Sequence, residues 1–244
     1  MRIGRLLTLV SALLLLAVSA AEAQEIRFGP FGGRTSGGGR YSYRGMPEGL
    51  QGDGTGFSFC RLAYRSVVQE AGGQGWTTDF PNADNNLMFR AEELTTIGMA
   101  KYPNGEFAYS IVLATNPDLY RCPFLFASDV GTMGLRDEEV VALQKYLEKG
   151  GFLWADDFQG ELLRVVPDAE IVDITPEYPM LSAMYRVKRI PQIPSINWWY
   201  RLGAGDEDTS ERGADSTTPH MRAAYDSHGR MIVLITHNTD IADG

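Results

Sequence analysis

The segment from Pro123 to Phe158 constrains the fold of this chain more than any other stretch. It opens with an apolar run at 124–127 and, after a polar break, continues with apolar residues at helical spacing from Val140 to Leu147. Gly150 and Gly151 follow a basic last turn, as at many helix ends, and a second apolar run occupies 152–155. The pattern predicts a βαβ unit, whose two strands run parallel.

Carboxylates follow both strands of this unit. Asp129 comes just after the first strand, and Asp156 and Asp157 come after the second. Ligands of open α/β sheets gather outside the carboxyl ends of parallel strands. The three carboxylates therefore predict a site on one edge of the sheet, which we call the rim.

Length and charge limit the class of protein. The chain has 244 residues, 44% of them hydrophobic, which is enough for the core of one α/β domain. Its formal charge of −9 argues against nucleic acid as a partner, because a phosphate backbone selects for basic surfaces.

The N-terminus has the features of a secretory signal. Arg2 and Arg5 precede a short apolar run at 6–19, and Ala21-Glu22-Ala23 resembles a cleavage site. We expect residues 1–23 to be a signal peptide cleaved after Ala23, so that the protein is exported to the periplasm or secreted and the mature chain has no transmembrane domain. An uncleaved anchor is the alternative, although the run is short for a membrane span.

Residues 24–56 are rich in glycine and lack an apolar period, which predicts a flexible linker before a domain at 57–244. Scattered Arg and Tyr residues in this linker leave contact with a polyanion as an alternative. Outside the cytosol, Cys60 and Cys122 would either form a disulfide or remain two buried thiols.

The domain contains further strand and helix patterns. A helix is expected around Leu87, Ala91 and Leu94, and a short one at 158–165. A hairpin is expected at 99–108 and strands are expected at 57–64, 110–115, 171–174, 221–225 and 231–236.

Polar residues near the start of the first helix add to the rim. Because this helix follows the first strand, we expect Asp79, Asp84 and Arg90 to converge on the edge that carries Asp129. The alternative is that Asp79, Asn82 and Asp84 only cap the helix and shape its turn.

The last two strands bring histidines together. With a turn at 226–229, His220 faces Ile235 and His237 lies diagonally beyond it. His237, Asn238 and Asp240 supply ligand types suited to a divalent cation, and Asp156, Asp157 and His237 are the candidate metal ligands. The alternative is that this group only hydrogen-bonds a loop.

Separated motifs give the chain a family resemblance. They are WTTDFPNADNNLMFRAEELTT, the Gly134 to Phe158 pattern, PHMRA and the closing HNTDIADG. Together they resemble the bacterial family catalogued as domain of unknown function 4159, which is similar to class I glutamine amidotransferase-like domains. The resemblance implies an α/β flavodoxin-like three-layer sandwich with a mainly parallel central sheet and a C-terminal β-hairpin.

The resemblance also bears on function. True glutaminases place a cysteine where this chain has Asp156-Asp157, so glutaminase activity is not expected. Arg136 stands where a capping Ser or Thr is expected, and such domains continue into a further helix beyond Gly244, which suggests truncation. Family members occur with von Willebrand-type modules and MoxR-type ATPases, which implies envelope protein partners.

Two functions fit these features. The first is a ligand- or protein-binding α/β module of the bacterial envelope. The second is a metal-assisted hydrolase that uses rim carboxylates with His237 or His220. Clustered carboxylates in one site raise the pKa of at least one of them unless a cation or an arginine neutralises the charge, so the arrangement costs stability when it is empty.

Overall fold

A computed structural model describes residues 55–68, 75–156, 160–194, 209–210 and 217–237. The chain divides into two compact units, Met1–Met46 and Pro47–Gly244, and all described residues belong to the second. The expected signal peptide, nearly all of the linker, and Asp157, Asn238 and Asp240 lie outside the described residues. Within the described part, no helix has the length and apolar character that a bilayer crossing requires.

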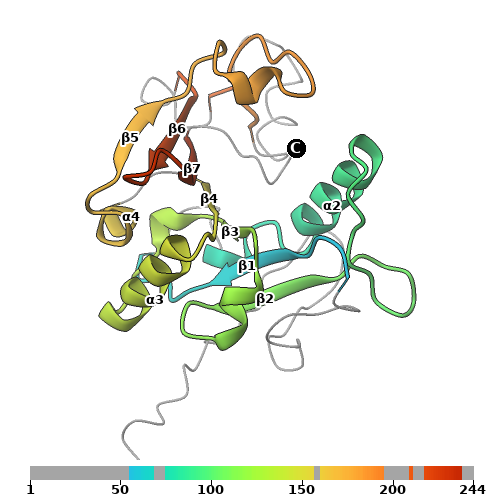
Figure 1. Cartoon of the computed structure of the whole chain (residues 1–244), viewed down its shortest axis with the longest axis horizontal. Helices are drawn as coiled ribbons and strands as arrows, with labels where there is room; N and C mark the ends of the chain where they lie inside the picture. The colour runs from blue at the N-terminus through green and yellow to red at the C-terminus, as the bar shows by residue number, and fades with distance from the viewer. Residues whose placement is uncertain (1–54, 69–74, 157–159, 195–208, 211–216, 238–244) are drawn as a thin grey trace, which may run out of the picture. The chain divides into compact units, whose positions relative to one another are not determined.

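The second unit is built on a seven-stranded mixed sheet (Figure 1), which confirms the α/β class. The strand order is β2-β1-β3-β4-β7-β6-β5. The first five strands in this order are parallel, whereas β6 is antiparallel to both of its neighbours. The strands are β1 (Phe59–Ala63), β2 (Tyr109–Leu113), β3 (Leu125–Ala127), β4 (Leu153–Asp156), β5 (Glu170–Asp173), β6 (His220–Tyr225) and β7 (Met231–His237).

The predicted βαβ unit is present. Strands β3 and β4 pair in parallel, with Leu125 opposite Leu153, and α3 (Asp137–Glu148) connects them. Arg136, in the position expected for a capping Ser or Thr, donates its backbone N–H to Glu139 Oε2 at 2.8 Å. Glu139 therefore makes the side-chain contact of a capping box at the start of α3. This contact forms although Arg136 has no side-chain hydroxyl.

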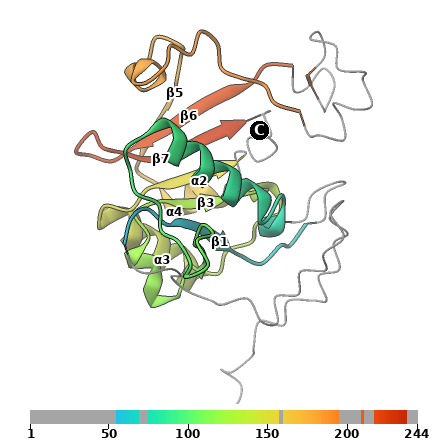
Figure 2. The same ribbon diagram turned by 90° about the vertical axis from the view of Figure 1, so that its right-hand side faces the viewer.

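Helices cover both faces of the sheet. Figures 1 and 2 show α2 (Asn82–Leu94) on one face, with α3 and α4 (Gly160–Val165) on the other. The α2 face carries a buried cluster of Phe59, Met88 and Phe126. Short 3-10 segments complete the described elements: η1 (Gly75–Thr77), η2 (Pro117–Arg121), η3 (Val130–Thr132) and η4 (Pro179–Ser182).

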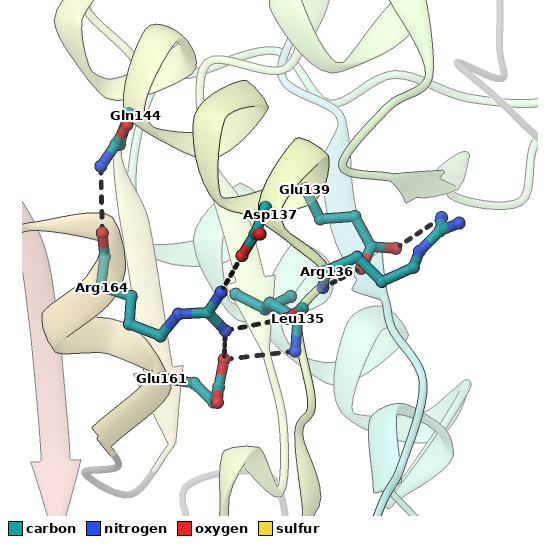
Figure 3. Close-up of polar contacts among 7 residues, drawn as sticks. All are labelled: Leu135, Arg136, Asp137, Glu139, Gln144, Glu161 and Arg164. Carbon is teal, nitrogen blue, oxygen red and sulfur yellow. Dashed lines mark hydrogen bonds and ion pairs between the residues drawn. The ribbon is translucent and has the colours of Figure 1, made fainter.

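One arginine fastens α4 to the start of α3 (Figure 3). Arg164 donates to Leu135 O at 2.8 Å and pairs with Asp137 and Glu161, each at 2.6 Å. In the other direction, Gln144 of α3 donates to Arg164 O at 3.0 Å. Both helices begin on the carboxyl side of their preceding strands, so these bonds fix the helix layer next to the rim.

The two cysteines form a disulfide. The bridge joins Cys60 of β1 to Cys122, which ends η2, with Cα atoms 6.0 Å apart and a sequence separation of 62. Both residues are buried. The question that the sequence left open is therefore answered in favour of a bridge, which joins β1 to the segment between η2 and β3.

The pairing of β6 with β7 differs from the prediction. His220 lies opposite His237, and Ile235 lies opposite Arg222. The Asp226 N–H donates to Arg230 O at 3.0 Å, so the turn holds three residues instead of four, and a register shift follows between Ala224 and Tyr225. The shorter turn and the register shift each move the pairing by one residue. Because side chains alternate between faces, the combined shift of two residues keeps every side chain on its expected face.

Candidate functional site

Arg61 and Asp84 form an ion pair beneath the rim. The Arg61 Nη2 to Asp84 Oδ2 distance is 2.6 Å, Nε donates to both carboxylate oxygens, and neither side chain is exposed. Burial raises the pKa of Asp84, and the charge of Arg61 opposes this shift. Asp84 therefore neutralises a strand arginine inside the protein, and neither it nor Asn82 caps α2, which begins after Pro81 with no side-chain cap.

Arg61 also holds the segment that precedes α2. Its Nη1 donates to Trp76 O and Thr78 O, each at 3.0 Å. Its guanidinium carbon lies 5.1 Å from the Phe126 ring centroid and 5.6 Å from that of Phe80. The two aromatic rings exclude water from the guanidinium, and cation–π attraction offsets part of the cost of this desolvation.

Two candidate residues near α2 have different positions. Asp79 adopts the left-handed conformation (φ 58°), and its carbonyl accepts the N–H of Ala83 at 3.0 Å, which starts the helix. Arg90 pairs with Glu93 at 2.7 Å on the exposed side of α2. The expected convergence of Arg90 on the rim is wrong, because eight residues of helix carry it about 12 Å from the helix start.

Asp129 lies on the rim, as expected, and holds the loop before α2. Its Oδ2 accepts the Gly75 N–H at 2.7 Å and lies 3.4 Å from Thr78 Oγ1. Asp129 itself has a positive φ of 50°, so the chain turns sharply at the end of β3. These contacts give the carboxylate a structural role.

The Tyr64 hydroxyl connects the carboxyl end of β1 to that of β3. It lies 2.6 Å from Ser128 O and from Asp129 O, both of which accept its hydrogen bond. Burial raises the pKa of Tyr64 far above its usual value, and the charges of Asp129 and Asp156 add to this rise. Asp129 and Asp156 thus lie close enough to act on one hydroxyl.

A row of three polar residues crosses the rim on the α2 face. Asp156 lies opposite Thr236, whose hydroxyl donates to Asp156 Oδ1 at 3.4 Å and accepts the Trp154 indole N–H at 3.3 Å. Ser128 follows Ala127, the partner of Ala155, so the register places it beside Asp156. The Ser128 hydroxyl is buried and has no hydrogen-bond partner among the described residues. We call Ser128, Asp156 and Thr236 the rim row.

The histidines lie on the opposite face from the rim row. Side chains alternate along β7, so His237 and Thr236 point to different faces of the sheet. The His220 and His237 ring centroids are 6.4 Å apart. Asp156 and His237 therefore do not converge, and among the described residues no group of three or more His, Cys, Asp or Glu side chains is placed to hold a metal ion.

Sequence reasoning missed four residues of this region: Arg61, Tyr64, Ser128 and Thr236. One signal was available for Arg61, since a charged residue inside an apolar strand needs a buried partner. The other three became visible only through strand register and loop conformation.

The comparison with protein families agrees with the family resemblance of the sequence motifs. A family model described as a domain of unknown function, DUF4159, matches residues 58–244. The chain belongs to the DUF4159 family. A search of the curated proteins found no match to this DUF4159 chain. The rim row of this DUF4159 domain and its histidine pair both lie within the matched residues.

Proposed function

We propose that this DUF4159 chain is an exported envelope module that binds a small, donor-rich ligand at the rim row. The observation that carries the proposal is the Ser128 hydroxyl, which is buried without a hydrogen-bond partner among the described residues. An unsatisfied buried hydroxyl costs free energy, which a bound ligand would recover.

The chemistry of the row favours a neutral or cationic ligand. An ionised Asp156 only accepts hydrogen bonds, and Thr236 already donates to it. The ligand would therefore supply N–H or O–H donors, as an amino acid, an amine or a sugar does. The net charge of −9 also disfavours anions.

Binding is favoured over catalysis because two other candidate carboxylates among the described residues are engaged in structure. Asp84 neutralises Arg61, and Asp129 holds the Gly75 N–H. By the family resemblance, Asp156-Asp157 stands where true glutaminases carry a cysteine, so the purified protein should release no glutamate from glutamine. The metal-assisted hydrolase is less well supported, since Asp156 and His237 lie on opposite faces.

Export is supported by the disulfide. Bridges of this kind persist in oxidising compartments and are rare in the cytosol. Together with the basic and apolar N-terminus, the bridge favours cleavage after Ala23 and a periplasmic or secreted protein. Partners from von Willebrand-type or MoxR-associated systems are proposed from the family resemblance alone.

We also infer a flavodoxin-like, glutamine amidotransferase-like arrangement. The order β2-β1-β3-β4-β7 of the parallel strands is that of doubly wound flavodoxin-like sheets, and β6 with β7 would form the C-terminal hairpin. In such sheets, ligands bind near the point where the strand order reverses, here between β1 and β3. Ser128 follows β3, next to this point.

The binding proposal is tested by thermal unfolding of the full chain with free amino acids, polyamines and sugars. Wild type and the control Ser182→Ala, which removes an exposed hydroxyl, should gain melting temperature with one ligand class. Ser128→Ala should lose that gain. An unchanged gain in Ser128→Ala, or a gain with anions only, would contradict the proposal.

Export is tested separately by the intact mass of protein recovered from the periplasm. The expected species begins at Gln24 and carries no free thiol. A cytosolic protein with an intact N-terminus and two free thiols would overturn this part of the proposal.

A further inference from the structure

His220 and His237 are direct cross-strand neighbours. They are opposite each other in the β6–β7 ladder, their ring centroids lie 6.4 Å apart, and the ring planes are inclined by 36°. Both residues are half-buried, so the imidazoles retain access to solvent. Two neutral imidazoles on one face are a pair of nitrogen ligands for a metal ion.

The surroundings of the pair permit a cation. Arg222 lies on the same face, two residues along β6, and its Nε pairs with Asp173 Oδ1 at 2.9 Å. The nearest cationic side chain along β6 is therefore neutralised by a carboxylate of β5. Asp156 points to the other face of the sheet and cannot join this site from its strand position.

We propose that His220 and His237 form a two-histidine site for a first-row transition-metal ion such as Zn²⁺. The remaining coordination positions would be taken by water or an external ligand, as in metal sites that keep open positions. Imidazole nitrogens suit Zn²⁺, Ni²⁺ and Cu²⁺, whereas Mg²⁺ and Ca²⁺ prefer oxygen ligands. This site is separate from the rim row and does not depend on the function proposed for it.

The distance between the rings is close to what such an ion requires. Zn–N bonds of about 2.0–2.1 Å hold two ring centroids roughly 5–6 Å apart on one ion. The observed 6.4 Å is slightly longer than this range, so the proposed site requires side-chain rotations that bring the two rings closer. A metal would then link β6 to β7 at the end of the hairpin far from its turn.

The test is a calorimetric titration of the full, untagged chain with Zn²⁺ at about pH 7.5, where imidazole is mostly neutral. The chain has three histidines, and His228, exposed in the turn, is the matched control. We expect one Zn²⁺ per chain for wild type and for His228→Gln. His220→Gln and His237→Gln should each weaken binding by at least about tenfold, since even loss of outer-shell support has that effect.

Mg²⁺ and Ca²⁺ titrated in the same way should give no binding at this site. Circular dichroism of each variant checks that the fold is kept, and the double variant His220→Gln/His237→Gln should bind no Zn²⁺ even if one single variant retains weak affinity. Absence of Zn²⁺ binding by wild type would overturn the proposal. So would binding that survives in the double variant or is lost in His228→Gln.

Discussion

Arg61 of β1 and Asp84 of α2 form a bidentate ion pair in which neither side chain is exposed to solvent. The pair joins the central sheet to the helix that follows the first loop. Because both charges are fully buried, removal of one leaves the other without compensation.

Asp84→Asn should lower the free energy of unfolding by about 3–5 kcal/mol, since it leaves the Arg61 charge buried. The measurement is urea unfolding of the full chain. Glu93→Gln makes the same chemical change in the exposed Arg90–Glu93 pair and should cost less than about 1 kcal/mol. Equal effects in the two variants would show that Arg61 and Asp84 are not the buried link described above.

Loss of the disulfide should destabilise the protein strongly. A bridge that closes a loop of this length contributes about 4 kcal/mol in the chain-entropy description, because it restricts the unfolded chain. Cys60→Ser/Cys122→Ser and the reduced wild type should both melt at lower temperature than the oxidised protein. A melting temperature unaffected by reductant would indicate that the bridge does not form.

Gly151→Ala should destabilise the junction of α3 and β4. A Cβ at Gly151 would lie 2.4 Å from the Tyr146 ring, whose hydroxyl bonds Phe152 O at 3.0 Å. Overpacking of this kind costs about 1–3 kcal/mol. Gly160→Ala is the control, since no atom of the described residues lies within 4 Å of its added Cβ. Urea unfolding should separate the two variants, and the prediction fails if their midpoints coincide.

Ser128→Ala should leave the stability of the ligand-free protein unchanged or raise it. The variant removes a buried hydroxyl that has no hydrogen-bond partner among the described residues, and so removes a desolvation cost. Ser58→Ala is the contrast, because the Ser58 hydroxyl is buried and bonded to Ala108 O and Ser110 Oγ. A marked loss of stability in Ser128→Ala alone would mean that its hydroxyl is already satisfied.

The β6–β7 turn should weaken in acid. Hydrogen bonds from the Arg230 and His228 backbone lower the pKa of Asp226 below its usual 3.8. A carboxyl with a lowered folded pKa stabilises the protein above the unfolded value and loses this contribution as pH falls through the folded value. The gap in melting temperature between wild type and Asp226→Asn should therefore close below about pH 3.8. Ser227→Ala, which removes no charge from the turn, should show no such closure.

The sequence predicted the parts of the fold that depend on local pattern. Apolar runs separated by a helical period gave β3, α3 and β4, because a buried parallel strand must be apolar on both faces. The helix α2 was also expected, but Leu94 of its predicted apolar face is exposed and Asp84 is buried. Hydrophobic spacing cannot identify a buried carboxylate whose partner is 23 residues away.

The sequence predicted that two carboxylates lie at neighbouring strand ends, but it did not predict the directions of the side chains. Asp129 and Asp156 lie at the carboxyl ends of neighbouring parallel strands and therefore on one rim, as the sequence predicted. The face of each side chain depends on strand register, so the sequence could not show that Asp156 and His237 point apart. Arg61, which pairs with Asp84, lies inside the first strand and was not predicted as a site residue.

The pairing at the far end of β6 and β7 depends on the number of residues between the two strands. That number includes the turn and the register shift between Ala224 and Tyr225. One residue added to or removed from the turn would place a residue other than His237 opposite His220 and would turn one strand over relative to the other. Residues 226–232 therefore act as a spacer whose length, more than its composition, decides which side chain His220 meets.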